Sequence, residues 1–262
     1  MARWAASPRL MLLIRPLLLI TLLLASHVGW AGTFSQIGSS RWVTVSRVYD
    51  GDTFITKKGE KVRLLGINTP ETAHGATPGQ ALAQKAKREL KTSVEGKTVR
   101  LVFDDEKYDS YGRLLAHVYL RDGRWINAHM IESGLAHAYT FAPNFRYSAE
   151  LLAKEQLVRN KKKGIWNTAR FRPLDSGEAD ERYIGQFRVV TGSVISIKKH
   201  GWRFKLGRLS ITIPNAYRQW FKTPPKLKEG DFIAVHGKIR ISNRGNLYLA
   251  LHSPYDLEII EP

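Results

Sequence analysis

The sequence predicts an α+β domain at residues 40–168, a linker at 169–185 and a second, mainly β domain with an OB-like layout at 186–262. Three observations predict this order. In the first part, short alternating stretches precede longer stretches with helical periodicity, the pattern of a small sheet covered by helices. After residue 186, short alternating stretches separated by turn residues dominate. Between the two parts the chain has little periodicity.

Five stretches of the first domain are expected as strands, because apolar residues alternate with polar ones or form short runs between turns. They are 41–48, 53–55, 62–67, 98–103 and 113–120. Asp50-Gly51 is a turn signal after the first stretch, and Asp122-Gly123 follows the last.

Three helices are expected in the same domain. The first begins at Thr77-Pro78, since threonine is a good N-cap and proline suits the first helical position. Behind it, apolar residues recur every four positions, at Leu82, Ala86, Leu90 and Val94. The second helix spans 126–133 and the third 148–163, and each is followed by a glycine that can end it.

The second domain is expected to hold five strands and one short helix, which is the layout of a small OB barrel. The strands are 187–197, 202–206, 209–213, 232–241 and 247–251, with the helix at 215–221. Lysines and arginines alternate there with aromatic residues, which suits the binding of single-stranded nucleic acid. The alternative is that most of these aromatic residues form the core.

The charge of the chain predicts a polyanionic partner. Forty-one basic residues against 23 acidic ones give a net charge of +18. Nucleic acid is the first candidate, and an anionic membrane or cell-wall polymer is the second. The chain has no cysteine, which excludes disulfides, thiolate zinc sites, cysteine nucleophiles and a lipoprotein anchor. A catalytic metal would therefore be held by oxygen or imidazole.

The N-terminal segment 1–31 is expected to be a signal peptide. Three arginines precede an apolar run at 16–25, and Gly29-Trp30-Ala31 resembles a cleavage site. The alternative is an uncleaved anchor, although the run is short for a bilayer span. We expect an exported protein, periplasmic or secreted, without stable membrane association once the signal is cleaved. Cleavage removes no acidic residue, so the mature chain stays strongly basic.

Three short motifs carry residue types that suit phosphodiester cleavage. They are Asp50-Gly51-Asp52-Thr53, the stretch 62–71 and Tyr111-Gly112-Arg113. Together they supply oxygen ligands for a hard cation, a free carboxylate to activate water, and two guanidiniums to stabilise the charge that develops. Each motif alone has a simpler interpretation: Asp-Gly-Asp-Thr is most often a hairpin turn, and each arginine also fits a surface ion pair.

Residues 43–166 resemble the staphylococcal (thermonuclease-type) nuclease family. The matching stretches are Asp50-Gly51-Asp52-Thr53, Arg63 to Glu71, Asp109-Ser110-Tyr111-Gly112-Arg113, Gly134-Leu135-Ala136, Pro143-Asn144 and Gly164-Ile165-Trp166. The resemblance implies a five-stranded OB-type barrel with three helices. It also implies a calcium-dependent phosphodiesterase that acts on DNA and RNA and leaves 3′-phosphates.

The resemblance implies a metal site with one departure from the family pattern. Asp52 would be a direct ligand, and the backbone carbonyl of Thr69 another. Asn68 stands where the family usually has an aspartate ligand. An amide oxygen still coordinates Ca2+ but removes a negative charge, so we expect weaker binding or a preference altered towards Mg2+ or Mn2+. Ser110 replaces a lysine usual beside the tyrosine, so we expect one phosphate contact to be weakened.

The resemblance also implies the catalytic and substrate-binding residues. Glu71 would be the general base that orients or deprotonates the attacking water. Arg63 and Arg113 would bind the scissile phosphate, and Tyr111 and Tyr139 would contact the nucleotide.

The sequence therefore predicts an exported metal-dependent endonuclease that hydrolyses DNA and RNA, with single strands preferred. The alternative is a non-catalytic protein that binds nucleic acid or another polyanion, with its metal site disabled at Asn68.

Overall fold

Five strands of the N-terminal half close into a barrel in the computed structural model, which describes residues 39–260. In barrel order the strands are β1 (Ser40–Val48), β2 (Thr53–Thr56), β3 (Lys61–Leu64), β6 (Leu114–Tyr119) and β5 (Thr98–Val102). Only the β3–β6 pair among them is parallel. The expected signal peptide at 1–31 lies outside the described residues. Residues 39–260 belong to one compact unit.

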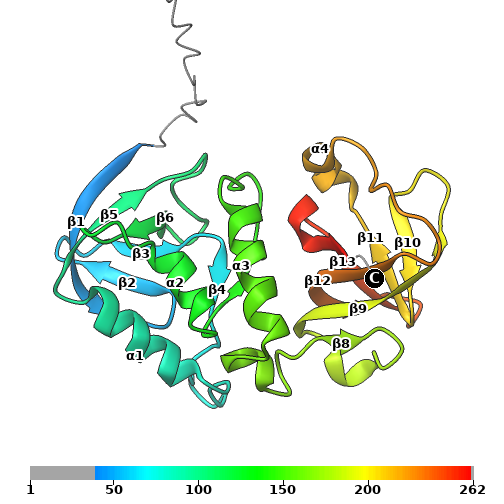
Figure 1. Cartoon of the computed structure of the whole chain (residues 1–262), viewed down its shortest axis with the longest axis horizontal. Helices are drawn as coiled ribbons and strands as arrows, with labels where there is room; N and C mark the ends of the chain where they lie inside the picture. Colours follow the sequence, from blue (N-terminus) through cyan, green and yellow to red (C-terminus); the bar gives the residue numbers. More distant parts are fainter. Residues whose placement is uncertain (1–38, 261–262) are drawn as a thin grey trace, which may run out of the picture. The chain divides into compact units, whose positions relative to one another are not determined.

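Three helices accompany this barrel (Figure 1): α1 (Ala83–Val94), α2 (Ile126–Glu132) and α3 (Ser148–Asn160). Apolar residues from the strands and from all three helices share one core. The α+β fold with a five-stranded barrel is thus confirmed. No helix in the described part of the chain is long and apolar enough to span a bilayer.

The expected strand 62–67 is interrupted at Gly66. The φ angle of Gly66 is +73°, and a Cβ there would lie 2.5 Å from Leu151 Cδ1, so only glycine fits. The chain turns at this point, and β4 (Ile67–Asn68) pairs with β7 (His137–Ala138) instead of continuing β3. After this turn, Asn68 lies within hydrogen-bond distance of Arg63 on β3.

The first helix begins later than the sequence predicts. Thr77 and His74 exchange backbone hydrogen bonds in a small loop, and α1 starts only at Ala83, after Leu82 with φ +66°. The N–H of Gln80 donates to the carbonyl oxygen of Glu71 at 2.8 Å. The predicted N-cap was wrong because these loop contacts, which the local sequence does not reveal, hold residues 72–80 outside the helix.

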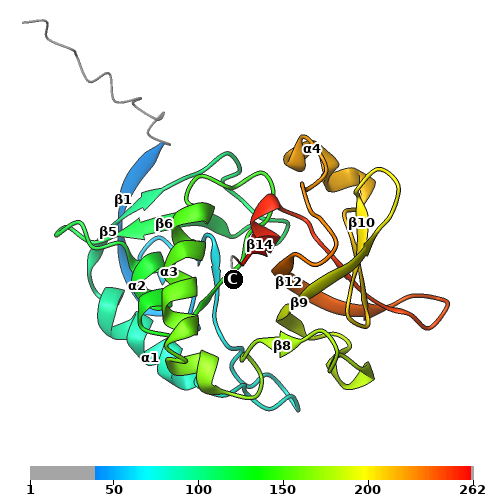
Figure 2. The same cartoon turned by 45° about the vertical axis from the view of Figure 1, so that its right-hand side comes forward.

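The second half of the chain forms a β barrel with the predicted OB-like character (Figure 2). Its strand order is β14-β12-β13-β11-β10-β9-β8, and a further pairing of β12 with β9 closes the sheet. The strands are β8 (Leu174–Asp175), β9 (Phe187–Ile197), β10 (Arg203–Leu206), β11 (Leu209–Thr212), β12 (Phe232–Ile241), β13 (Leu247–Ala250) and β14 (Leu257–Ile259). The expected short helix is a 3-10 turn, Asn215–Tyr217, followed by α4 (Arg218–Phe221). Further 3-10 turns are Gly164–Asn167, Glu181–Tyr183 and Pro254–Asp256.

Part of the expected linker 169–185 packs on the second barrel. Leu174–Asp175 forms β8, which pairs in parallel with β9, and Leu174 and Ala179 belong to the core of this barrel. Two isolated apolar residues in a polar stretch do not reveal such a strand in the sequence.

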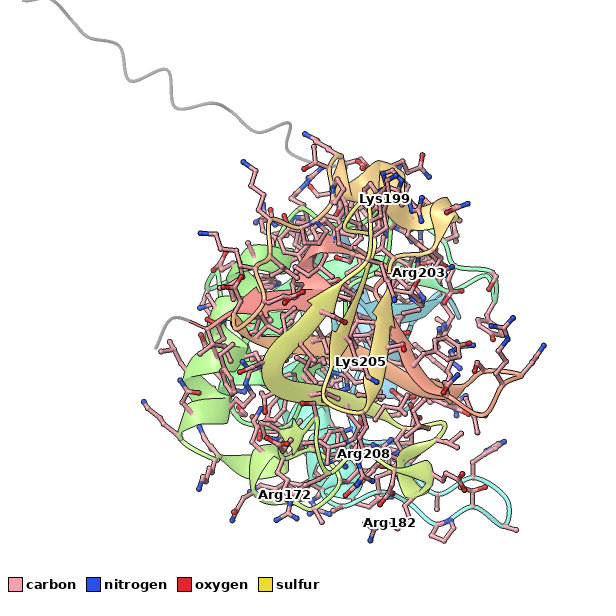
Figure 3. All side chains as sticks on the ribbon, turned by 90° about the vertical axis from the view of Figure 1, so that its right-hand side faces the viewer. Arg172, Arg182, Lys199, Arg203, Lys205 and Arg208 are labelled. Atoms are coloured by element: carbon pink, nitrogen blue, oxygen red, sulfur yellow. The ribbon has the colours of Figure 1, made fainter. Side chains whose placement is uncertain are left out.

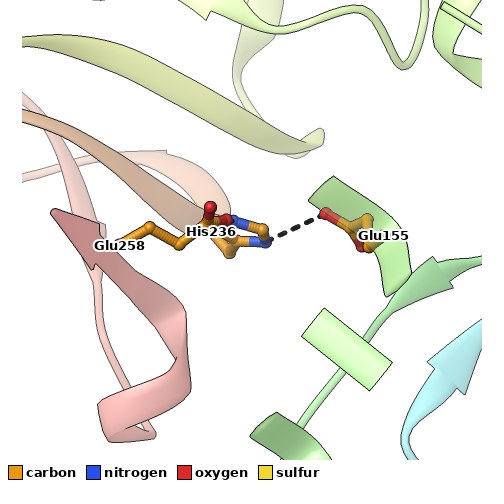
Figure 4. A group of neighbouring side chains, drawn as sticks. All are labelled: Glu155, His236 and Glu258. Carbon is orange, nitrogen blue, oxygen red and sulfur yellow. Dashed lines mark hydrogen bonds and ion pairs between the residues drawn. The ribbon is translucent and has the colours of Figure 1, made fainter. Parts of the chain in front are cut away.

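A buried ionic cluster joins α3 to the second barrel (Figure 4). It consists of the three residues drawn there, Glu155, His236 and Glu258, together with Arg159. Arg159 donates to Glu155 Oε1 at 2.8 Å and makes two bonds to Glu258, at 3.0 and 2.6 Å. His236 Nε2 bonds the same Glu258 carboxylate. Val158 packs beside this cluster against Val189 and Ala234.

The ionic cluster has the residue types of a metal site but the charge of an ion-pair network. Burial alone would raise the pKa of Glu258, but hydrogen bonds from His236 and Arg159 hold it at about 2. Burial would lower the pKa of His236, yet the bond to Glu258 and the charge of Glu155 raise it. The guanidinium and the imidazolium thus neutralise the two carboxylates that a metal would need.

Candidate active site

Asp52 is held in the turn between β1 and β2. Its Oδ2 atom accepts hydrogen bonds from the N–H of Thr69 at 3.0 Å and from Thr69 Oγ1 at 3.1 Å. Its Oδ1 atom accepts one bond, from Thr53 Oγ1 at 3.0 Å. A Cβ at Gly51 would lie 2.6 Å from Thr69 Oγ1, so glycine allows this close approach. The Asp-Gly-Asp-Thr motif therefore clamps the turn against Thr69 and leaves a lone pair on Oδ1.

Arg63 is buried beside Asp52, and it pairs with Thr53 across β2 and β3. Its Nη2 atom lies 3.2 Å from Asp52 Oδ2 and donates to Asn68 Oδ1 at 2.8 Å. Its Nη1 atom donates to the carbonyl oxygen of Leu64 at 2.8 Å. An arginine inside a strand needs such anionic and carbonyl partners, and they orient its guanidinium towards the cleft.

Asn68 bridges two groups of the predicted metal site. Its Nδ2 atom donates to the backbone oxygen of Thr69 at 3.2 Å, while its Oδ1 atom accepts from Arg63. Both oxygens that the sequence predicts as ligands at these two positions therefore already accept a hydrogen bond. An aspartate cannot donate the first of these bonds when it is ionised.

Asp50 is a further carboxylate at the site, and it was not among the predicted site residues. Its Oδ1 atom accepts from the N–H of Asp52 at 3.1 Å. Burial and the negative charge of Asp52 raise the pKa of Asp50 to about 6. The sequence signal for it was present, because Asp50 opens the motif that contains Asp52. Two carboxylates this close favour a cation between or beside them.

Glu71 lies at the rim of the same site. Its backbone N–H donates a hydrogen bond to Gln80 Oε1 at 3.2 Å. Partial burial and the charge of Asp52 raise the pKa of Glu71, while Arg63 and Arg113 oppose the shift. A raised pKa suits a carboxylate that must accept a proton.

Arg113 follows a turn that Asp109 organises. Asp109 Oδ1 accepts from the backbone N–H groups of Tyr111 and Arg113 at 2.9 Å each, and Oδ2 accepts from Arg113 Nε at 2.6 Å. Within residues 39–260 the two terminal nitrogens of Arg113 have no hydrogen-bond partner. The guanidinium is thus fixed at one edge and free at the other, as phosphate binding requires.

The two predicted substrate tyrosines differ in their surroundings. Tyr111 is 83% exposed, and the Arg113 guanidinium lies 5.4 Å from its ring centroid. Tyr139 is 38% exposed and makes an edge contact with Phe187, with ring centroids 5.5 Å apart. Tyr139 faces a cleft, whereas Tyr111 stands at the surface beside it.

A cleft of about 500 Å³ collects most of the predicted site residues. Those that line it are Asp52, Arg63, Asn68, Glu71, Arg113 and Tyr139, together with Asp50. Thr69 and Tyr111 are not among the lining residues. A second wall comes from residues outside the predicted site, Arg170, Phe171, Gly185, Phe187 and Lys238, although Lys238 is one of the basic residues of the second barrel that suit nucleic-acid binding.

Comparison with known proteins identifies the family of this chain. A family model described as staphylococcal nuclease homologue matches residues 61–168. The thermonuclease of Staphylococcus intermedius is 34% identical over 153 residues, which cover 56% of this chain and 90% of that protein. This chain belongs to the staphylococcal nuclease family.

Other relatives of the family are similar over the same part of the chain. The thermonuclease of Staphylococcus hyicus is 34% identical over 144 residues, covering 52% of this chain and 85% of its own. The endonuclease YncB of Bacillus subtilis is 36% identical over 130 residues, covering 48% of this chain and 61% of its own. These matches confirm the expected family and an enzyme of the nuclease class.

Proposed function

We propose that this protein is an exported, metal-dependent nuclease that hydrolyses the phosphodiester bonds of DNA and RNA, with single strands preferred. One observation carries the proposal: a single cleft contains the carboxylate of Glu71 together with the guanidiniums of Arg63 and Arg113 and the carboxylates of Asp50 and Asp52. In a purely structural ion-pair network, each charged group would be paired with a neighbouring group of opposite charge. Here the terminal nitrogens of Arg113 and the carboxylate oxygens of Glu71 have no partner within residues 39–260.

The oxygen atoms of the cleft fit a hard divalent cation. Asp52 Oδ1 keeps a lone pair, and the carboxylates of Asp50 and Glu71 are available beside it. Asp52 would therefore be the principal ligand of such a cation. Asn68 Oδ1 and the Thr69 carbonyl oxygen would be additional ligands once the hydrogen bonds that they accept from Arg63 and Asn68 are broken. A divalent cation held there supplies positive charge against the phosphate oxygens. Ca2+ is the expected ion, with Mg2+ or Mn2+ as alternatives because Asn68 lowers the site's charge.

The protein's own residues perform the remaining tasks. Arg113 binds a non-bridging phosphate oxygen through its free terminal nitrogens, and Arg63 exchanges part of its contact with Asp52 and Asn68 for the phosphate. Glu71 accepts a proton from the attacking water as its oxygen bonds to phosphorus. The P–O5′ bond breaks, the 5′ oxygen takes up a proton from solvent, and a 3′-phosphate remains. Charge that builds on the phosphate is stabilised by both guanidiniums.

The shape of the cleft supports the preference for single strands. Walls on both sides leave about 500 Å³, and the second wall carries aromatic rings. An unpaired nucleotide can enter such a space and stack, whereas a duplex must first open at a cost in base stacking.

Cleavage assays test the proposal. Purified protein should degrade labelled single-stranded oligonucleotides in Ca2+ and stop when the cation is chelated. Duplex of the same sequence should be cut more slowly. If the oligonucleotides stay intact in Ca2+, Mg2+ and Mn2+ alike, the proposed nuclease activity is refuted. The alternative would then remain, a protein that binds nucleic acid without cleaving it. The hydrogen bond from Asn68 to Thr69 is the observation that favours this second candidate.

Export is supported by the N-terminal sequence alone. Three arginines precede the apolar run at 16–25 and the small residues near 31. Sequencing the N-terminus of the protein recovered from the periplasm or the medium tests this part. A start near residue 32 is expected, and a protein retained in the membrane with residue 1 intact would indicate an anchor.

A further inference from the structure

The second barrel forms one wall of the nuclease cleft. Phe187 on β9 and Lys238 on β12 line it, as do Arg170 and Phe171 just before β8. All of these residues lie beyond residue 168, where the match to the family model ends. Their chemistry is therefore an addition to the family's nuclease domain.

The aromatic part of this wall is continuous across the two barrels. The ring of Phe187 stacks on that of His137, with centroids 4.6 Å apart and an interplanar angle of 22°. Tyr139 meets Phe187 edge-on and lies 6.0 Å from Phe141. Burial lowers the pKa of His137 to about 4, so this imidazole is neutral at neutral pH. His137 is buried and supports the ring of Phe187, so the uncharged ring surface on which a base can stack comes from Tyr139 and Phe187.

Two cations flank these rings. Arg170 Nη1 donates to the carbonyl oxygen of Phe187 at 2.9 Å and to Gln186 Oε1 at 3.2 Å. Lys238 lies directly opposite Phe187 in the register of β9 and β12, so both side chains project from the same face of the sheet. Neither cation forms an ion pair within residues 39–260. Partial burial lowers the pKa of Arg170, and a bound anion would offset that cost.

The wall is held in place relative to the catalytic residues. Glu155 accepts a hydrogen bond from the N–H of Ala138, between His137 and Tyr139, and also bonds Arg159. Arg159 in turn bonds Glu258 of the second barrel. A separate hydrogen bond joins Thr140 Oγ1 to Asp256 Oδ1 at 3.1 Å. Preorganised contacts of this kind lower the entropy lost when a ligand binds.

We propose that the second barrel provides an additional nucleotide subsite, in which Phe187 and Tyr139 stack a base next to the scissile bond while Lys238 and Arg170 bind the adjoining phosphate. The subsite rests on the proposed function, since it places a substrate strand in the same cleft. It makes the enzyme favour strands of several nucleotides over the shortest cleavable substrate.

The outer face of the same barrel supplies a matched control. Figure 3 shows basic side chains on the β9–β10 face, among them Lys199, Arg203, Lys205 and Arg208. Lys205 is exposed on β10 and is not among the residues that line the cleft. Replacing it removes one positive charge from the same domain without touching the subsite.

The test compares Lys238→Ala, Phe187→Leu and the control Lys205→Ala on two substrates, a dinucleotide phosphodiester and an oligonucleotide of about 12 nucleotides. For Lys238→Ala and Phe187→Leu, the ratio of kcat/KM on the oligonucleotide to kcat/KM on the dinucleotide should fall about tenfold, as loss of one stacked base or phosphate contact predicts. Lys205→Ala should leave this ratio unchanged. An unchanged ratio in Lys238→Ala, or an equal fall in all three variants, would overturn the subsite.

A binding measurement separates this proposal from the nuclease itself. In chelator, affinity for the same oligonucleotide is measured against salt concentration for the wild type, Lys238→Ala and Lys205→Ala. The slope of log affinity against log salt should become shallower by about 0.7 in Lys238→Ala only, because one phosphate contact on a single strand is lost. Binding with this slope change but without cleavage in any cation would retain the subsite and refute the nuclease. Cleavage without any change of slope in Lys238→Ala would retain the nuclease and refute the subsite.

Discussion

The side-chain amide of Asn68 donates a hydrogen bond to the backbone carbonyl oxygen of Thr69, over 3.2 Å. An ionised aspartate at this position would have no proton to donate and would leave the carbonyl oxygen free for a cation. Asn68 therefore lowers the charge of the site and also engages one of its expected ligands. The relationship bears directly on the metal affinity of this family member.

Asn68→Asp should tighten metal binding. The substitution restores one negative charge and frees the carbonyl oxygen of Thr69, while Oδ1 can still accept from Arg63. We expect the Ca2+ concentration for half-maximal cleavage to fall about tenfold, equivalent to about 1.4 kcal/mol. Titration of cleavage rate against Ca2+ measures it. Asn215→Asp, at an exposed turn of the second barrel, adds the same charge and should leave the midpoint unchanged. An identical midpoint in both variants would show that Asn68 does not limit metal binding.

Glu71→Gln should abolish most of the activity and the acid limb of its pH profile. A base works only when ionised, and the pKa of Glu71 is raised by burial and by Asp52, so the rate should fall as pH drops through that raised pKa. We expect a loss of about 10²–10⁴ in kcat with oligonucleotide affinity retained. Glu229→Gln, on an exposed turn, is the control. A variant that keeps the wild-type rate and profile would remove Glu71 from the role of base.

Asp109 should act as a positioning residue for Arg113. Its carboxylate accepts a hydrogen bond from Arg113 Nε at 2.6 Å. Burial would raise the pKa of Asp109, but backbone and side-chain hydrogen bonds from Arg113 outweigh it and lower the pKa. Arg113→Lys loses the planar donor fork and should lower kcat about 10²–10³-fold. Asp109→Ala should lower kcat less, with little change in KM. Kinetics of both are compared with Arg124→Lys, an exposed arginine that also pairs with the aspartate two residues before it. A purely structural Asp109 would change thermal stability without this fall in kcat.

The sequence was informative where function depends on local motifs. Asp52, Arg63, Asn68, Glu71 and Arg113 are separated by turns whose glycines and prolines are visible in the chain, and the cleft contains them all. Their assignment as ligands, base and phosphate-binding groups stays a prediction, because position in a cleft does not establish a role.

Contacts between residues far apart in the chain could not be predicted from the sequence. Glu258 contacts Arg159 of α3 although the two residues are 99 positions apart in the sequence, and Glu258 does not lie in a recognisable motif. Phe187 and Lys238 reach the nuclease cleft only because β9 and β12 pair in one register. Periodicity indicates which face of a strand is buried, but not which distant surface that face meets. The second wall of the cleft could be found only in the folded chain.

Glu258→Gln should destabilise the fold by about 3–5 kcal/mol, since it leaves the buried charges of Arg159 and His236 without their partner. The lowered pKa of Glu258 gives stability that is present above its unfolded value, about 4.3, and is lost as pH falls towards 2. The raised pKa of His236 gives stability that is fully present below its unfolded value, about 6.5, and is lost as pH rises through the folded one. Urea unfolding across pH should therefore show the largest contribution of this cluster between about pH 4.3 and 6.5. Glu178→Gln, an exposed carboxylate of the same barrel, should change stability by less than about 0.5 kcal/mol. Equal effects of the two variants would mean that the cluster does not fasten the second barrel to α3.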